Sequence, residues 1–265
     1  MFLPLNSFEN ICVCFLLMII YSTAGWVGEM IYHSIVIKHL SEKRGFLNGF
    51  LCPIYGHGAL LVLYVLNGGL KNPLLTFLAG MVLTTALEYF TSWYMEKLFH
   101  ARWWDYSQKR FNINGRVCAS NLLAFGVMGV FVVKVLNPFA FGLFAKIPPL
   151  WLDAITITLT ALLVADVAIS AGVLTKIRGA AESVRADNTE AITKAVREAL
   201  MAQGFLLRHP LHAFPEVQFY NKAHLARLKA KHDELQANMR EKREKLQQEL
   251  DRLEEKRKAL KKGKK

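Results

Sequence analysis

The sequence predicts an all-α membrane protein: a bundle of about five transmembrane helices followed by a basic helical tail. The mean hydropathy of the 265-residue chain is positive, at +0.23, and 53% of its residues are hydrophobic. Apolar runs of about 20 residues recur, which is the length needed to cross roughly 30 Å of hydrocarbon. Charge is concentrated elsewhere, because residues 176–265 hold 22 of the 33 Lys and Arg residues.

Five apolar runs are long enough to be membrane spans. They cover residues 8–31, 50–70, 73–98, 117–137 and 150–175. The first run could alternatively belong to a cleaved signal peptide, with Ser22, Thr23 and Ala24 as the small residues before the cut. No Lys or Arg precedes it, however, and Glu9 stands where a positive charge is expected, so the sequence favours a retained helix.

The basic residues predict the orientation, since positively charged loops stay in the cytoplasm. With the basic tail placed inside, five spans put the N-terminus outside. The inner loops, residues 32–49 and 99–116, then hold most of the Lys and Arg of this region, whereas the outer segments hold Lys71 and Lys146. We therefore expect an N-out, C-in topology, with a transmembrane domain over residues 1–175 and a cytoplasmic tail over residues 176–265.

The start of the second predicted span is unsuited to a regular helix. It contains Gly45, Gly49, Pro53, Gly56 and Gly58. Proline lacks an amide proton, and each glycine weakens a helix by about 1 kcal/mol relative to alanine. We expect this helix to begin late or to be kinked. Its irregular backbone should face other helices or a cavity, because a membrane offers no water to satisfy it.

The tail predicts two helical parts. The first carries an apolar stripe made by Ile192, Ala195, Val196, Ala199 and Leu200. Gly204 and Pro210 are expected to end that helix. In the second part, residues 216–262, a seven-residue repeat runs from Leu225 to Leu260 and favours a coiled coil. The companion positions turn polar at Lys242, so a solvated or partner-docking helix is an equal alternative.

Ionisable residues within the predicted spans are the candidates for a substrate pathway. Counting about 1.5 Å per residue places Glu29, His57, Glu88 and Asp166 in the inner half of the bilayer. Such groups cost roughly 2.5–3.5 kcal/mol there, so they usually face a cavity or one another. We expect a polar cavity open to the cytoplasm. The alternatives are a structural role for His57 and an interfacial position for Glu29, paired with a basic residue such as Arg44.

The third predicted span adds polar residues to the same hypothesis. Thr84, Glu88 and Ser92 are four residues apart and therefore share one face of a helix. A polar face in an apolar helix is suited to packing against protein rather than lipid. Thr84 and Ser92 are therefore included among the pathway candidates.

The loop after the third span is the candidate docking surface for a partner. Aromatic rings settle at the headgroup level and basic residues stay in the cytosol where a membrane helix leaves the bilayer. The docking candidates, from this loop and the preceding inner loop, are Arg44, Arg102, Trp103, Trp104, Asp105, Tyr106 and Arg116.

A series of short motifs follows one after another through most of residues 8–175. They are Gly25-Trp-x-x-Glu29, Arg44-Gly-Phe-Leu-Asn-Gly49, Cys52-Pro-Ile-Tyr-Gly56, Leu87-Glu-Tyr-x-Thr-Ser92, Glu96-Lys97, Trp103-Trp-Asp-Tyr-Ser107, Phe111-Asn112 and Gly115-Arg116. Together they resemble the bacterial family of ABC-transporter type IV membrane proteins, and the tail around His212-Ala-Phe-Pro215 is also similar. The chain departs from the family pattern at Phe50 and Arg110, where proline is common. The resemblance implies a multi-pass protein of the bacterial cytoplasmic membrane.

Neither a cofactor nor a metal site is predicted. The sequence lacks the G-x-x-x-x-G-K-[ST] signature, so a transporter containing this chain would need an ATPase from another subunit. Cys12 and Cys14 point to different faces of one helix, while Cys52 and Cys118 fall near the cytoplasmic ends of their spans. None of these cysteines suggests a disulfide or a metal site.

The leading hypothesis is a permease-like transporter subunit that docks an ATPase through its inner loops. A second hypothesis is a membrane enzyme acting on a lipid or prenyl substrate, with Glu88, His57, Asp105 and Arg116 supplying acid, base and headgroup contacts. A third is a non-transporting scaffold whose basic tail binds anionic lipid, a ribosome or an acidic protein. The expected partners are membrane lipid, an ATPase and a second copy of the chain, and no motif indicates nucleic-acid binding.

Overall fold

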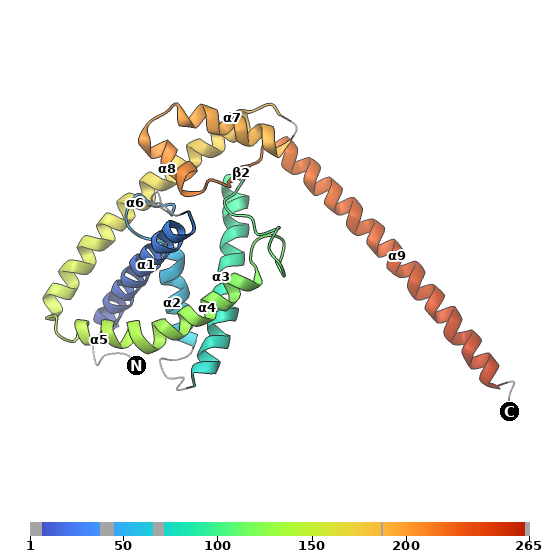
Figure 1. Cartoon of the computed structure of the whole chain (residues 1–265), viewed down its shortest axis with the longest axis horizontal. Coiled ribbons are helices and arrows are strands. Elements are labelled where there is room, and N and C mark those ends of the chain that lie inside the picture. The colour runs from blue at the N-terminus through green and yellow to red at the C-terminus, as the bar shows by residue number, and fades with distance from the viewer. Residues whose placement is uncertain (1–6, 38–44, 66–71, 187, 263–265) are drawn as a thin grey trace.

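The computed structural model is built almost wholly from helices (Figure 1). It describes residues 7–37, 45–65, 72–186 and 188–262. Within these ranges the helices are α1 (Ser7–Ile37), α2 (Pro53–Val65), α3 (Pro73–Phe99), α4 (Ala119–Phe131), the π-helix η1 (Val132–Leu136), α5 (Asn137–Phe144), α6 (Pro149–Ser183), α7 (Thr189–Met201), α8 (Phe205–Ala213) and α9 (Lys222–Lys262). Two short strands, β1 (Ala101–Arg102) and β2 (Gln218–Phe219), pair antiparallel. The all-α class is confirmed.

Four helical stretches are long and apolar enough to cross a membrane. They are Asn10–Ile35, Pro73–Phe99, Ala119–Phe144 and Pro149–Ser183. Helix α2 replaces the second predicted span and has 13 residues, or about 20 Å. Residues 66–70 of that predicted span lie outside the described ranges. The described chain thus has four long apolar helices and one short one, where the sequence predicted five spans.

Helices α1, α2, α3 and α6 run lengthwise in the molecule, between the end that carries α7 and α8 and the opposite end (Figure 1). Helix α1 begins at that opposite end, and the α4–α5 helix runs largely across the lower part of the view. The orientation of the chain in a membrane stays a prediction.

The second helix begins late, as its glycines and proline predicted. Residues 45–52 are non-helical, and α2 starts at Pro53, which occupies the first helical position where its missing amide proton costs little. Helices α1 and α2 then pack through small residues. An added Cβ at Gly56 would overlap the Ser22 hydroxyl, and one at Gly25 would overlap the Tyr55 ring. Small residues therefore allow this close approach.

The fourth apolar helix is longer than predicted. The sequence analysis ended it at residue 137, but the helix continues to Phe144 through the π-helical turn η1. Pro138 stands in the first turn of α5, and the wider π turn before it accommodates the missing backbone hydrogen bond. The Tyr21 hydroxyl donates to Asn137 Oδ1 at 3.0 Å, which ties this turn to α1.

A folded unit, which we call the cap, lies at the charged end of the molecule and shares its core with the ends of α3 and α6. It consists of β1, Trp103, α7, α8, β2 and the end of α6 from Val173 onward. Its buried core is made by Phe99, Ala101, Trp103, Val173, Leu174, Ile177, Ala181, Ile192, Val196, Leu200, Leu211, Val217 and Phe219. These residues come from both sides of residue 175, so one core joins the predicted transmembrane domain to the predicted tail.

The tail helices follow the prediction in part. The apolar stripe of α7 is confirmed, because Ile192, Val196 and Leu200 are buried. Gly204 lies between α7 and α8, as expected. The expectation for Pro210 is wrong, because Pro210 lies inside α8, five positions after its first residue, Phe205. Pro210 lies beyond the first four residues of the helix, so its missing amide proton removes one intrahelical hydrogen bond, and α8 ends three residues later at Ala213.

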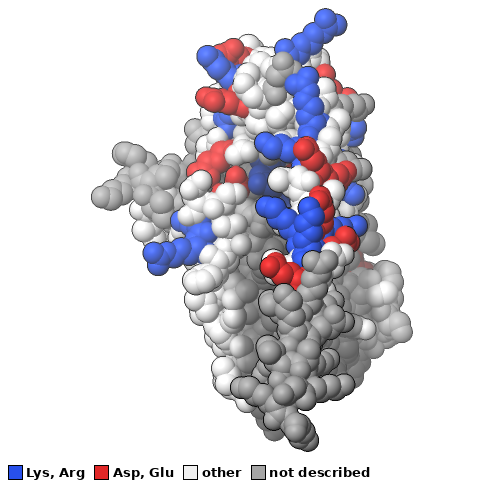
Figure 2. All heavy atoms as spheres, turned by 90° about the vertical axis from the view of Figure 1, so that its right-hand side faces the viewer, with Lys and Arg blue, Asp and Glu red and all other residues white. Residues whose placement is uncertain are grey.

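Helix α9 extends from the cap as a single helix of 41 residues (Figure 1). From residue 226 onward its side chains are exposed as far as they are described, including the apolar residues Leu228, Leu235, Met239, Leu246 and Leu250. The described chain therefore shows a lone helix, and a coiled coil stays a prediction. Figure 2 shows Lys, Arg, Asp and Glu gathered over the upper half of one face, while the described surface below them is uncharged.

Candidate functional site at the junction of helices and cap

A polar stripe on α3 forms the base of the candidate site. Glu88, Ser92 and Glu96 are four residues apart and face the loop of residues 103–118. Glu88 and Ser92 are each 6% exposed, so the sequence prediction of a polar face that packs against protein is supported by burial. The loop returns along the side of α3 and supplies the partners of this stripe.

Glu88 is held by two neutral donors. The Tyr106 hydroxyl and the Asn121 amide nitrogen each lie 3.4 Å from its Oε1 atom. Its other oxygen, Oε2, is buried and has no hydrogen-bond partner among the described residues. Leaving a buried polar group unsatisfied costs about 1–3 kcal/mol. A proton or a polar ligand group at Oε2 would remove that cost, which makes Glu88 the strongest candidate for a functional acid.

Arg116 fixes the loop against α3. Its guanidinium donates to Ser92 Oγ at 3.2 Å and pairs with Glu96 Oε2 at 3.0 Å, and the residue is 8% exposed. Its backbone oxygen accepts from the Trp104 indole nitrogen at 3.1 Å. Arg102 pairs with the same Glu96 oxygen at 3.2 Å. Two arginines therefore share one carboxylate and hold both ends of the loop.

Asp105 shapes the turn that follows. Its Oδ1 atom accepts from the backbone nitrogen and the hydroxyl of Ser107, at 3.0 and 2.6 Å. Gly115 lies against this group with a φ of +66°, and an added Cβ would overlap Asp105 Oδ1. Only glycine fits both the left-handed backbone and the close approach. Asp105 is thus a structural acceptor within the loop.

The tryptophans differ in their surroundings. Trp103 is 3% exposed and packs edge-on against Phe46, with ring centroids 4.8 Å apart, and against Phe214 at 5.5 Å. Trp104 is half-buried and lies 6.5 Å from Phe214. The structure thus places Trp103 inside the cap, where a partner cannot reach it directly.

Residues 45–52 connect the cap to the apolar helices. On the cap side, the Phe46 ring stacks on Phe214 at 4.4 Å, and the Leu47 carbonyl oxygen lies 3.2 Å from His209 Nε2. On the helix side, Asp166 of α6 accepts from the backbone nitrogens of Asn48 and Gly49, at 2.8 and 2.6 Å. Consecutive residues therefore contact the cap core and an acid in a spanning helix.

Asp166 has further polar partners. The Asn48 side-chain amide donates to it at 3.1 Å, and the Ser170 hydroxyl donates at 3.2 Å. Charge-assisted bonds to backbone amides are among the stronger hydrogen bonds in proteins. Asp166 therefore accepts hydrogen bonds from the irregular backbone before α2, in agreement with the expectation that this backbone faces other helices.

Glu29 lies near the Glu88 group but has its own partners. The Tyr55 hydroxyl donates to its Oε1 atom, and His33 Nε2 lies 3.4 Å from Oε2. Burial raises the pKa of the Tyr106 hydroxyl, and the nearby carboxylates of Glu88 and Glu29 raise it further. Tyr106, which lies outside the spanning helices, therefore stays protonated and can donate to Glu88.

Three sequence candidates do not join this network. His57 is exposed, and its Nδ1 lies 2.7 Å from the Pro53 carbonyl oxygen of its own helix, in agreement with the structural alternative. The Thr84 hydroxyl donates to the Gly80 carbonyl oxygen of α3 at 2.6 Å. Arg44 lies outside the described residues.

Some residues of the site were not singled out from the sequence. Asn121 and Tyr55 contact the predicted acids, and Asn48 binds Asp166. Asn121 is a polar residue in an apolar run, which is the same signal that identified Glu88. Glu96 and Asn48 belong to the short motifs that resemble the family, but a motif does not reveal which residue each side chain contacts.

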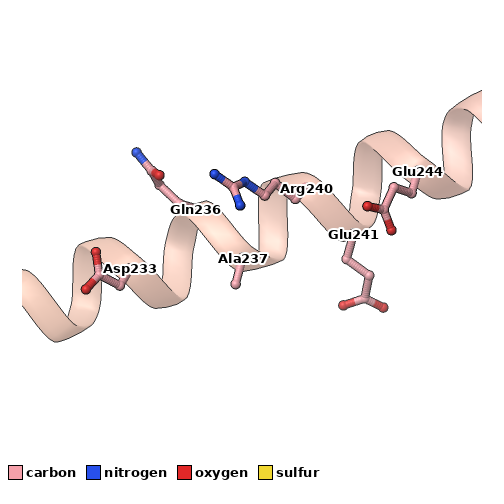
Figure 3. Close-up of a pocket in the computed structure, with 6 residues that line it drawn as sticks. All are labelled: Asp233, Gln236, Ala237, Arg240, Glu241 and Glu244. Carbon is pink, nitrogen blue, oxygen red and sulfur yellow. The ribbon is translucent and has the colours of Figure 1, made fainter.

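A shallow hollow on α9 lies far along the chain from this network. Figure 3 shows its lining residues, Asp233, Gln236, Ala237, Arg240, Glu241 and Glu244, all from the same exposed helix. Side chains of one helix supply a single wall and cannot enclose a ligand. The polar cavity expected around Glu88 stays a prediction.

The long apolar helices, their exposed apolar surfaces and the buried acid Glu88 define a multi-pass membrane protein. The family model described as "Putative ABC-transporter type IV" matches residues 16–171, which is more than half of the chain. The chain belongs to this family. No match was found among curated proteins or among solved structures.

Proposed function

We propose that this chain is a permease-like membrane subunit of an ABC-type transporter, with the ATPase supplied by another chain. Its membrane is the bacterial cytoplasmic membrane, and its topology is N-out, C-in. Family membership and the four long apolar helices support this reading. The sequence carries no nucleotide-binding signature, so ATP hydrolysis would occur on the partner.

The contact of residues 46–49 with both the cap and α6 is the observation that carries this proposal. A partner that moves the cap would pull on Phe46 and Leu47, and the next two residues are bonded to Asp166. Rigid elements with specific contacts are what energetic coupling between sites requires. Cap movement would thus reach the inner ends of the helices, where Glu88 and Glu29 supply polar groups for a substrate.

The cap offers the docking surface for the ATPase. Met201, Phe205 and Leu206 are 41%, 74% and 46% exposed at the corner between α7 and α8. Apolar side chains gathered on a folded, otherwise polar unit are typical of protein contact sites. The inner-loop residues Trp103 and Arg116 would then support the surface from within.

The test is a mild-detergent purification through a C-terminal tag, followed by identification of co-purifying proteins and an ATPase assay. We expect a stoichiometric ATPase that is lost in Phe205→Ser and retained in Met239→Ser, a matched change at an exposed residue of α9. Glu88→Gln should keep the complex and lower substrate-stimulated ATP hydrolysis. Recovery of the chain alone with bound lipid would contradict the proposal and favour a membrane enzyme or a scaffold.

A further inference from the structure

The turn between the two halves of the loop exposes an apolar pair next to two basic residues. Phe111 and Ile113 are 85% and 57% exposed, and Lys109 and Arg110 are also exposed. We call residues 109–113 the loop tip. None of these side chains contributes to the buried network around Glu88 and Arg116, so the tip has to be explained separately.

The fold holds the tip in this conformation. The Asn112 amide donates to the carbonyl oxygens of Ser107 and Lys109, at 3.1 and 2.8 Å, and its Oδ1 accepts from the Gly115 nitrogen at 3.0 Å. Phe111 adopts a φ of +53°, which is uncommon for a residue with a side chain. A large apolar ring is therefore presented outward by specific bonds at a conformational cost.

The tip lies beside α3 well before the end of that helix. The Asn114 amide donates to the Tyr89 hydroxyl at 2.8 Å, and its carbonyl oxygen accepts from Arg102 at 3.3 Å. Tyr89 precedes Phe99, the last residue of α3, by ten positions, or about 15 Å. The loop thus runs back along α3 from the cap toward the apolar part of the helices.

An apolar surface begins at the same level. Phe90 of α3 is 56% exposed next to Tyr89, and Leu123 of α4 is 53% exposed two positions after Asn121, the partner of Glu88. Surfaces of this kind on spanning helices face lipid tails. The tip is therefore adjacent to the edge of the lipid-facing surface, where the headgroup layer lies.

We propose that the loop tip inserts Phe111 and Ile113 into the headgroup layer of the inner leaflet, where Lys109 and Arg110 bind the phosphates of anionic phospholipids. Aromatic residues are enriched at this level, and each basic residue near an anionic surface improves binding about fivefold. A soluble protein would have to displace headgroups to reach the tip. The inference concerns membrane contact and does not depend on an ATPase or a transported substrate.

The depth of the tip can be measured in nanodiscs. A nitroxide is attached to Phe111→Cys, and the enhancement of its relaxation is measured with two agents. Oxygen partitions into lipid, whereas a nickel chelate stays in water. The native cysteines are buried or half-buried, and the unsubstituted protein gives their background. We expect oxygen to enhance relaxation more than nickel at residue 111. We expect the reverse at Phe205→Cys, the matched exposed phenylalanine on the cap.

Headgroup selectivity is tested with discs of phosphatidylcholine alone and of phosphatidylcholine and phosphatidylglycerol in equal parts. The amount of phosphatidylglycerol retained by the protein should fall about tenfold or more in Lys109→Gln/Arg110→Gln. It should be unchanged in Lys242→Gln/Arg243→Gln, a matched pair on exposed α9.

Three results would overturn the inference. One is nickel dominating at residue 111 in both kinds of disc, and another is unchanged lipid retention in the tip variant. The third is displacement of phosphatidylglycerol by inorganic phosphate, which would assign the two basic residues to a free anion. The tip residues are exposed, so the melting temperature of the variants should equal that of the unsubstituted protein and serves as a folding control.

Discussion

The cap and the spanning helices are both rich in apolar residues, yet they bury them to very different extents. In the cap, Ile177, Ile192, Val196 and Phe219 are 0% exposed. In the most apolar stretches of α3, of the α4–α5 helix and of α6, only 17% of residues are buried. The cap has completed its core within the chain, whereas the helices leave apolar surface for lipid or for a second protein. Hydrophobicity alone therefore does not show which kind of neighbour a residue has.

One substitution made in both regions gives the sharpest comparison. Ile192→Ala removes buried atoms from the cap core and should lower its free energy of unfolding by about 3–4 kcal/mol. Ile157→Ala removes the same atoms from a side chain of α6 that is 65% exposed, and should change stability by less than about 0.5 kcal/mol. Chemical denaturation in detergent measures both. Equal losses would show that Ile157 is packed against protein.

Removing Arg116 should separate the loop from α3. Arg116→Ala leaves Glu96 with Arg102 alone and removes the donor to Ser92, so we expect a loss of about 3 kcal/mol. Limited proteolysis of residues 103–118 and a thermal melt are the measurements. Arg110→Ala, at an exposed arginine of the same loop, is the control and should be neutral in detergent. Similar melting temperatures for the two variants would contradict the bonded network.

Asp166→Asn tests the connection between the two regions. The neutral side chain is a weaker acceptor and brings an amide toward the Gly49 nitrogen, so we expect a loss of about 2 kcal/mol. Hydrogen exchange at Asn48 and Gly49 should accelerate, while exchange within the cap core should not. Asp153→Asn, near the other end of the same helix, is the matched control. Unchanged exchange at residues 48 and 49 would remove Asp166 from its bonding role.

The last expected effect, which appears only outside the ordinary pH range, is a loss of cap stability at high pH. Burial raises the pKa of Tyr220 from its ordinary value of 10 to about 12. The folded cap favours the neutral hydroxyl of Tyr220. The stabilisation that this preference gives is therefore complete below pH 10 and is lost as the pH rises from 10 to 12. Each pKa unit corresponds to about 1.36 kcal/mol, so a rise of about two units gives a total loss of about 3 kcal/mol. The free energy of unfolding of Tyr220→Phe should not show this loss between pH 10 and 12. An identical pH profile for the two proteins would contradict the role of Tyr220.

Several elements of the helical region follow from local sequence. The start of α3 at Pro73 and its end within one residue of the predicted position were predictable, because Asn72 caps the helix and the basic loop follows it. The buried stripe of α7 was equally clear from its spacing. The continuation through Pro138 was not, because the π turn that permits it has no distinct pattern in the sequence.

The cap could not be predicted in the same way. Its two-residue strands pair Ala101 with Phe219, more than a hundred residues apart, and such short strands show no periodicity. Trp103 lies in a run of aromatic and basic residues that is typical of a membrane interface, yet it is buried in the cap core. The sequence identified Glu88 and Asp166 as ionisable groups within apolar helices. Their partners Tyr106 and Asn48 depend on how the loops return, which is a property of tertiary structure.

The exposed apolar residues of α9 determine how that helix could pair. Leu228, Leu235, Met239, Leu246 and Leu250 alternate steps of seven and four, which make an eleven-residue repeat. Eleven residues make slightly more than three full turns of a helix, whereas seven make slightly less than two, so the stripe drifts slowly and in the opposite sense to a heptad seam. A helix packed along it would wind with right-handed superhelical twist. The companion heptad positions turn polar at Lys242, yet the eleven-residue stripe continues beyond it through Leu246 and Leu250.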